Sequence, residues 1–459
     1  MKLTHFTALA TGVAASLVTA GANAQSADAL VNKLLEKGIL TQKEAEDLKK
    51  ETNDGFSKAY SSRSGMPSWV TGMKFNGDFR GRAEDFGADN SAFNERFRYR
   101  YRLRLGVLVT MKDVFDIGFR LASGDPLSGG GSGGNPLSAN TTLQDGASRK
   151  NIYIDTAFAR WNAIHTDDWK LTATIGKMDR DQPLEISNMV LDYDYNPEGA
   201  ALQAGYNINK DHALKLNGGF FALDEFNQGA LASRDPYMFG GQLIWKAKWT
   251  KQIESDLGIS AFSLAHKDNL TSAAAPNQND GNSRDAVTGG LMYNYNPIIG
   301  SAGLTFKAAA FPGYREYKDD KGEKIPFPIR FGGEYMENPG APGQNVGYNA
   351  GVTFGKAGKK GWWELAYRYQ RLEADAWYEE FVDDDNGAFY QNPKLTHGFG
   401  SGGWRGGTNI KGHFVKASYS VTDSLTAVAS FYLDELVTPD PTGSISAANH
   451  FLFDLNWKF

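Results

Sequence analysis

The 459-residue sequence predicts an all-β transmembrane protein: an antiparallel β-barrel of 16 or 18 strands, preceded by a short helical periplasmic segment. Three observations support this fold. Apolar and polar side chains alternate from about residue 69 to Phe459, short and long connections alternate over the same stretch, and most tryptophans lie beside the short connections. A period of two is typical of strands with one face in lipid and the other in water.

Residues 1–24 are predicted to be a secretory signal peptide. Lys2 supplies the positive end, an apolar stretch extends through Val18, and residues 22–24 form a cleavage site of small residues. We therefore expect export, with a mature chain that begins near Gln25. A membrane anchor is disfavoured because the apolar stretch is short and rich in Ala and Thr.

Residues 25–68 are predicted to form a helical periplasmic segment followed by a linker. Leu30, Leu34 and Leu35 mark one face of a first helix, and the sequence from Thr41 to Glu44 is that of a capping box, which begins a second helix. Two helices of about three turns cannot bury a core alone, so we expect them to pack on other copies or on another structure. Residues 52–68, rich in Ser, Gly and Lys, form the predicted linker.

The barrel is predicted to occupy residues 69–459. Its clearest strand lies at residues 96–110, where seven apolar residues from Phe97 to Val109 alternate with five arginines. A helix would scatter both sets around its circumference. Similar alternation marks residues 73–83, 115–121, 169–175, 214–220, 346–354, 363–369, 425–433 and 451–459. Residues 151–163 are ambiguous, because both faces carry apolar side chains.

The connections place the predicted strands in an outer membrane. Turns such as 110–114, 165–168, 209–212 and 422–424 are short, whereas the stretches 124–149, 178–198, 266–285 and 373–407 are long and polar. Eight of the ten tryptophans lie beside short turns, and Trp377 and Trp404 are the exceptions. Short turns with an aromatic girdle are typical of the periplasmic side of such a barrel.

The number of strands is left open by the sequence. About 17 segments can be recognised, but termini on the same side of the membrane require an even number in this class. A weak strand near residues 312–321 would give 18, and a segment that lies outside the wall would give 16. A barrel of either size leaves an aqueous channel.

Composition excludes several classes of function. The chain has no Cys, which rules out disulfides and thiolate metal sites, and its formal charge of −5 indicates no nucleic-acid partner. The histidines are dispersed, and residues 383–387 fail the spacing of an EF-hand, because Val382 would occupy the first ligand position. We expect no metal, no cofactor and no catalytic set, although a calcium-bridged surface loop at 383–387 is left open.

Arginines on the predicted strands are the first set of candidate site residues. One arginine on the lipid face costs about 2–4 kcal/mol at the bilayer midplane, so five would cost on the order of 10 kcal/mol, comparable with the whole stability of a domain. The arginine face therefore points into water. Two compatible interpretations remain open: a ladder that lines the pore, or a structural network with carboxylates of neighbouring strands. The predicted pore-lining residues are Arg80, Arg82, Arg96, Arg98, Arg100, Arg102, Arg104 and Arg120.

Residues 178–198 are the candidate constriction loop. If this stretch folds into the lumen, its acids face the basic wall and create a transverse field; the alternative is a solvated external loop. Wall arginines are held rigidly, whereas loop acids can turn toward solvent, so we expect a weak preference for anions. The arginines at mid-strand, Arg98, Arg100 and Arg102, are expected to lie deepest in the lumen. The candidate acids are Asp179, Asp181, Glu185, Asp192, Asp194 and Glu198.

These features together resemble a bacterial family of putative porins, which is distantly similar to the phosphate-selective porins. The resemblance rests on the signal peptide, the helical piece GILTQKEAEDL (38–48), the arginine-rich strand, and the stretches LDYDYNPEGAALQAGY (191–206) and TNIKGHFVKASYSVTDSLT (408–426). It implies a diffusion channel in the outer membrane of a Gram-negative-type bacterium, assembled as a homotrimer. Trp457 and Phe459 are similar to the C-terminal signal read by the outer-membrane assembly machinery.

Three functions can be weighed from the sequence. The first is a porin surrounded by outer-membrane lipid, a passive channel for small hydrophilic solutes or anions. The second is a structural protein that links the barrel to the cell wall through the N-terminal helices. The third, an outer-membrane enzyme, is disfavoured because the sequence offers no paired Ser/His or Asp/His set.

Overall fold

The structure is a computed structural model that describes residues 33–35, 37, 41, 43–46, 48, 50, 66–127, 133–225, 234–270, 280–309, 324–391 and 402–459. The chain divides into two compact units. One is formed by Met1–Met73 with Val109–Val114, and the other by Lys74–Leu108 with Phe115–Phe459.

In the first unit, residues 33–35, 43–46, 48 and 50 are helical. The expected capping box is present: the Glu44 amide donates to Thr41 Oγ1 (3.3 Å), and the Thr41 amide donates to Glu44 Oε2 (2.8 Å). The predicted signal peptide and most of the predicted linker lie outside the described residues. In the part of the chain that the structure describes, no helix is long and apolar enough to cross a membrane.

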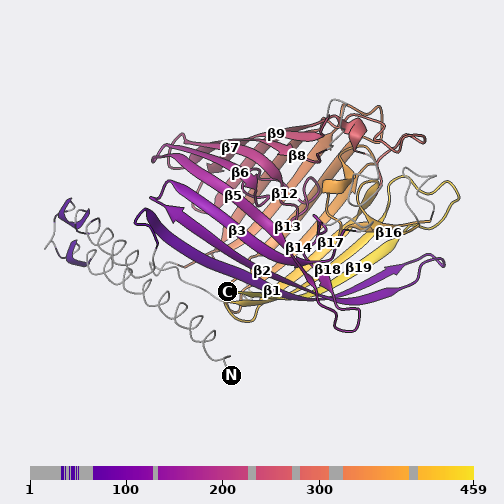
Figure 1. The fold of residues 1–459 in the computed structure, drawn as a ribbon, viewed down its shortest axis with the longest axis horizontal. Coiled ribbons are helices and arrows are strands. Elements are labelled where there is room, and N and C mark those ends of the chain that lie inside the picture. Colours follow the sequence, from indigo (N-terminus) through magenta and orange to yellow (C-terminus); the bar gives the residue numbers. More distant parts are fainter. Residues whose placement is uncertain are drawn as a thin grey trace, which may run out of the picture. The chain divides into compact units, whose positions relative to one another are not determined.

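The second unit is a closed antiparallel barrel with 16 wall strands among the described residues. Each strand pairs with its neighbours in the sequence, and β1 closes the barrel on β19 from Asp78↔Lys458 to Ala88↔Ala448 (Figure 1). The wall strands are β1 (Val70–Ala88), β2 (Arg96–Met111), β3 (Phe115–Gly124), β5 (Asn151–His165), β6 (Trp169–Lys177), β7 (Glu198–Asn207), β8 (His212–Ala222), β9 (Tyr237–Lys248), β10 (Ile253–Ala265), β11 (Ile298–Ala308), β12 (Phe327–Glu337), β13 (Val346–Gly355), β14 (Trp363–Leu372), β17 (Ile410–Ser420), β18 (Leu425–Leu436) and β19 (Ala448–Lys458).

The closed wall decides between the two predicted strand numbers in favour of 16. β11 and β12 pair directly, from Ile298↔Glu337 to Ala308↔Phe327, so no strand pair separates them in the wall. The weak strand considered near residues 312–321 lies outside the described residues. The ambiguous stretch 151–163 falls within β5, whose pairing with β6 shifts register between Asn162 and Ile164; such a bulge interrupts strict alternation.

The two faces of each strand differ as the alternation predicts. On β2, the side chains of Phe97, Tyr99 and Leu105 are 57%, 56% and 48% exposed, whereas Arg100 and Arg102 are buried. The outer face is therefore apolar and the inner face charged, which suits a wall with lipid outside. Trp161, Trp169, Trp249 and Trp457 are likewise exposed near the short turns and contact aromatic neighbours; Trp169, for example, stacks on Tyr206 at 4.4 Å.

Four long loops between strands matter for the site. We name them L2 (125–150), L3 (178–197), L5 (266–297) and L7 (373–409). L2 contains the two-residue strand β4 (Thr141–Thr142), which pairs with β2, and L5 contains the 3-10 helix η1 (Lys267–Asn269). L7 contains the 3-10 helix η2 (Glu379–Phe381) and a small sheet of β15 (Gly387–Tyr390) and β16 (Gly403–Gly406).

The main apolar cluster of the described residues lies where loops meet the inner face of the wall. L3 contributes Met189, Val190 and Leu191, all fully buried, and L7 contributes Trp377 and Phe381. Phe221, Met238 and Phe262 complete it from β8, β9 and β10. Burial of these side chains against one another, rather than against lipid, holds the loops inside the barrel.

Candidate functional site

A charged cavity of about 1220 Å³ lies between the wall, L3 and L7. Among the described residues that line it, nine are basic and eleven are acidic. The basic residues are Arg80, Arg82, Arg102, Arg104, Arg120, Arg180, Arg330, Arg368 and Lys416. The acidic residues are Asp179, Asp181, Glu185, Asp192, Asp194, Asp256, Glu334, Asp383, Asp384, Asp385 and Asp454.

Five of the eight predicted pore-lining arginines line this cavity: Arg80, Arg82, Arg102, Arg104 and Arg120. The other three lie outside it. Arg100 is buried under L2, where its guanidinium donates to Ser138 Oγ (3.3 Å) and Asn140 O (3.2 Å). Arg98 pairs with Glu84, and Arg96 is exposed beside the β1–β2 connection. Of the three mid-strand arginines, Arg102 lines the cavity, whereas Arg98 and Arg100 do not.

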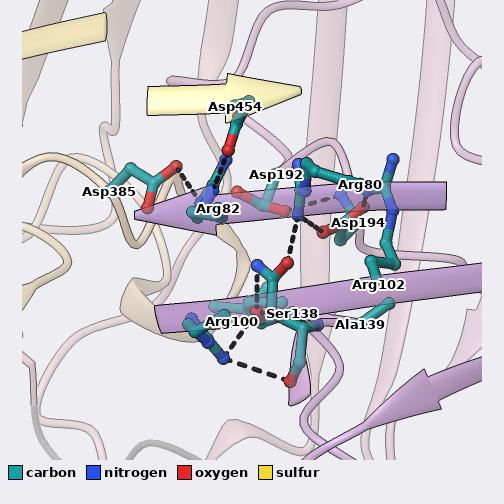
Figure 2. A network of polar contacts seen from close by, with 12 residues as sticks. Arg80, Arg82, Arg100, Arg102, Ser138, Ala139, Asp192, Asp194, Asp385 and Asp454 are labelled. Atoms are coloured by element: carbon teal, nitrogen blue, oxygen red, sulfur yellow. Dashed lines mark hydrogen bonds and ion pairs between the residues drawn. The ribbon is translucent and has the colours of Figure 1, made fainter. Parts of the chain in front are cut away.

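Carboxylates from neighbouring strands pair with the arginines. On β1, Asp78 binds Arg102 (3.0 Å) and Arg104 (2.7 Å), and Glu84 binds Arg98 and Arg100. On β19, Asp454 accepts two hydrogen bonds from Arg82, at 2.7 and 2.9 Å (Figure 2). A bidentate pair of this kind is among the strongest that a guanidinium makes. The structural network and the lumen-lining ladder thus coexist in one set of arginines.

Asp194 of L3 is the loop acid most deeply engaged with the ladder. Its carboxylate lies 3.0 Å from Arg102, 3.9 Å from Arg80 and 3.9 Å from Arg104 (Figure 2). Burial by itself raises the pKa of Asp194, but Arg102, Arg80 and Arg104 outweigh burial and hold the pKa below its usual range. Asp194 is therefore ionised and fixes L3 against β1 and β2.

The remaining predicted acids show that L3 crosses to several other strands. Glu185 binds Lys215 of β8 and Lys246 of β9, and Asp179 binds Arg120 of β3 at 2.6 Å. Asp181 pairs with Arg180 but is largely exposed. Glu198, the first residue of β7, pairs with Lys177 and does not line the cavity. L3 thus lies inside the barrel, held at both ends and in the middle.

Sequence reasoning missed L7 as part of this site. Trp377 is fully buried and its Nε1 donates to Val190 O of L3 (2.8 Å). Two backbone hydrogen bonds join the same loops, from the Asp192 amide to Phe381 O (2.6 Å) and from the Asp383 amide to Asn188 O (3.1 Å). A signal was available: Trp377 and Trp404 fall in a long loop, and a tryptophan away from the girdle needs another place to bury its ring.

Asp192, Asp383 and Asp384 form a compact group where L3 meets L7. Their carboxylate oxygens lie within 4.8 Å of one another. Burial raises the pKa of Asp192 and of Asp384, and the neighbouring carboxylates raise both further. The group is the sole set of three acidic or histidine residues with metal-ligand spacing in the described chain. Arg368, 3.6 Å from Asp383, supplies a positive charge beside the group.

Comparison with known proteins gives a match to a family model over part of the chain and a similarity in fold. Residues 88–290 match the model of a family described as "Putative porin". Among solved structures, OprB of Pseudomonas putida is similar over 84% of this chain and 94% of its own, with 12% identity and a TM-score of 0.50. Salmonella typhi OmpF, in complex with daunomycin, is similar over 84% and 97%, with 8% identity and a TM-score of 0.45. No curated protein matches the chain in sequence.

Proposed function

We propose that this chain is an outer-membrane porin, a passive diffusion channel for small hydrophilic solutes. The match of residues 88–290 to a porin family model and the closed 16-strand barrel support this proposal. The place of the protein is the outer membrane of a Gram-negative bacterium, with the apolar outer face of the wall in lipid. The observation that carries the proposal is the 1220 Å³ charged cavity enclosed by that wall. Family and fold indicate a channel rather than an enzyme.

The charges of the cavity support only a weak selectivity between small anions and small cations. Each of the five predicted arginines that line it has a carboxylate within 4 Å. Paired charges partly cancel at the distance of a passing ion, because the field of a pair falls off faster than that of a single charge. The anion preference expected from the arginines alone is therefore reduced, and neutral polar solutes meet donors and acceptors on every side.

Planar-bilayer recording of the purified, folded protein tests the proposal. We expect stepwise conductance increases, and swelling of protein-containing liposomes in small sugars that declines as the sugar grows. Folded protein that inserts without any conductance would refute the channel and favour the structural alternative, in which the N-terminal helices hold the cell wall. The expected homotrimer, signal peptide and recognition by the assembly machinery stay predictions.

A further inference from the structure

L7 is held inside the barrel from the side of L5. Glu379 of L7 and Arg284 of L5 form an ion pair in which both side chains are 0% exposed. Asn282 of L5 donates to Ala374 O (2.6 Å) and Trp377 O (2.8 Å), and Tyr295 donates to Asp375 (2.8 Å). Together with the backbone bonds to L3, these contacts make L7 a fixed part of the lumen.

The tip of L7 is also attached to the wall, at Asp385 and at Gly387. The carbonyl oxygen of Asp385 lies 3.1 Å from His450 Nδ1 on β19, and the Gly387 amide donates to Asp434 Oδ2 on β18 at 3.0 Å. The Asp385 carboxylate lines the cavity, and its side chain is 27% exposed. A passing ion therefore meets this charge at a fixed position.

Nearby cations neutralise the negative charge of Asp385 only in part. Its nearest cation is Arg82 at 3.6 Å, but Arg82 already forms the bidentate pair with Asp454 and has Glu84 at 3.5 Å (Figure 2). The opposite holds for Asp194, which faces three arginines. Arg82 thus divides its charge among three carboxylates, one of which, Glu84, also binds Arg98 and Arg100, so Asp385 has only a share of one cation. Asp194 has three arginines near it, two of which also bind Asp78.

Three of the eleven acidic residues that line the cavity lie at the L7 tip. Burial and neighbouring carboxylates raise the pKa of Asp384, whereas the Asp385 side chain, 27% exposed, presents negative charge to the lumen. We infer that Asp385 is a specificity-determining residue, which opposes the arginine ladder and moves the selectivity of the channel toward cations. The inference rests on the proposed function. It assigns to L7 the role of opposing the wall arginines, which sequence reasoning gave to L3 alone.

The reversal potential in a tenfold KCl gradient tests this role. Asp385→Asn removes the charge with almost no change in shape, and Asp268→Asn is the matched control, since Asp268 lies in L5 outside the cavity and its side chain is 84% exposed. We expect Asp385→Asn to raise the chloride-to-potassium permeability ratio about twofold, the effect of one charge within a Debye length of the ion path. Asp268→Asn should leave the ratio unchanged.

A conservative variant separates charge from structure. Asp385→Glu keeps the charge and should keep the wild-type ratio, while heat-modifiable electrophoretic mobility shows that all variants are folded. A ratio for Asp385→Asn that does not differ from that of Asp268→Asn would overturn the inference while leaving the channel intact. Absence of conductance in the wild-type protein would instead refute the proposed function itself.

Discussion

Glu379→Gln should release L7 from the lumen. The substitution leaves Arg284 as an uncompensated charge at a site where both side chains of the pair are 0% exposed. The buried carboxylate of Glu379 is the main group that raises the pKa of Arg284 against the opposing effect of burial. A guanidinium keeps its proton in a protein even without that partner, so Arg284 stays charged in the variant and the loops must rearrange to hydrate it.

The structure allows the cost to be estimated. Removing one partner of a buried ion pair costs about 3–5 kcal/mol. Arg284 keeps its hydrogen bonds to Leu270 O (3.2 Å) and Gly289 O (3.1 Å), which favours the lower end of that range. A loss of about 3 kcal/mol raises the population of the detached loop about a hundredfold.

Amide hydrogen exchange measures that population. The Asp192 and Asp383 amides bond across the L3–L7 contact, so their protection reports its opening. We expect exchange of peptides that contain these amides to accelerate about a hundredfold in Glu379→Gln. Conductance should rise and become noisier, since a detached L7 no longer fills part of the lumen.

Two controls make the result interpretable. Arg284→Met combined with Glu379→Gln removes both charges and should recover most of the protection, because a neutral pair carries no charge to hydrate. Glu435→Gln breaks the ion pair with Lys411, in which the Glu435 side chain is 53% exposed. This variant should change the protection of the Asp192 and Asp383 amides little. Exchange in Glu379→Gln no faster than in Glu435→Gln would show that the buried pair does not hold L7.

Three other predictions follow from particular contacts. Phe459→Ala should lower the amount of folded, heat-modifiable protein in the outer membrane, since the Phe459 backbone pairs with Gly77 and its side chain is the aromatic that directly follows β19; normal levels would contradict the assembly role. Arg102→Gln should move the reversal potential toward cations, whereas Arg98→Gln, outside the cavity, should move it less; equal shifts would place the constriction elsewhere. Raising the pH should also increase the preference for cations. Burial and neighbouring acids raise the pKa of Asp192 and Asp384, so both are protonated below the raised pKa and gain negative charge above it. A reversal potential independent of pH would argue against a role of this group.

The candidate site could be predicted in part. The water-facing arginines follow from their charge on an alternating strand, whereas loop length left the entry of residues 178–198 into the lumen as one of two alternatives. The role of L7 does not follow from the sequence, because the spacing of residues 383–387 indicates only whether they could form a calcium loop. Asp383 and Asp385 contact residues of L3, β1, β14 and β19, and nothing in the local sequence indicates these contacts.

The sequence by itself determined which side of each strand faces lipid, since backbone alternation and the cost of arginine in hydrocarbon act on each strand separately. It also determined that the wall is closed and has an even number of strands, either 16 or 18. Only the tertiary structure decided which charges meet. Arg82 and Asp454 are 372 residues apart and become neighbours because β1 closes on β19. The paths of L3 and L7 were decided in the same way, by apolar side chains such as Val190 and Trp377, which could be buried only against each other.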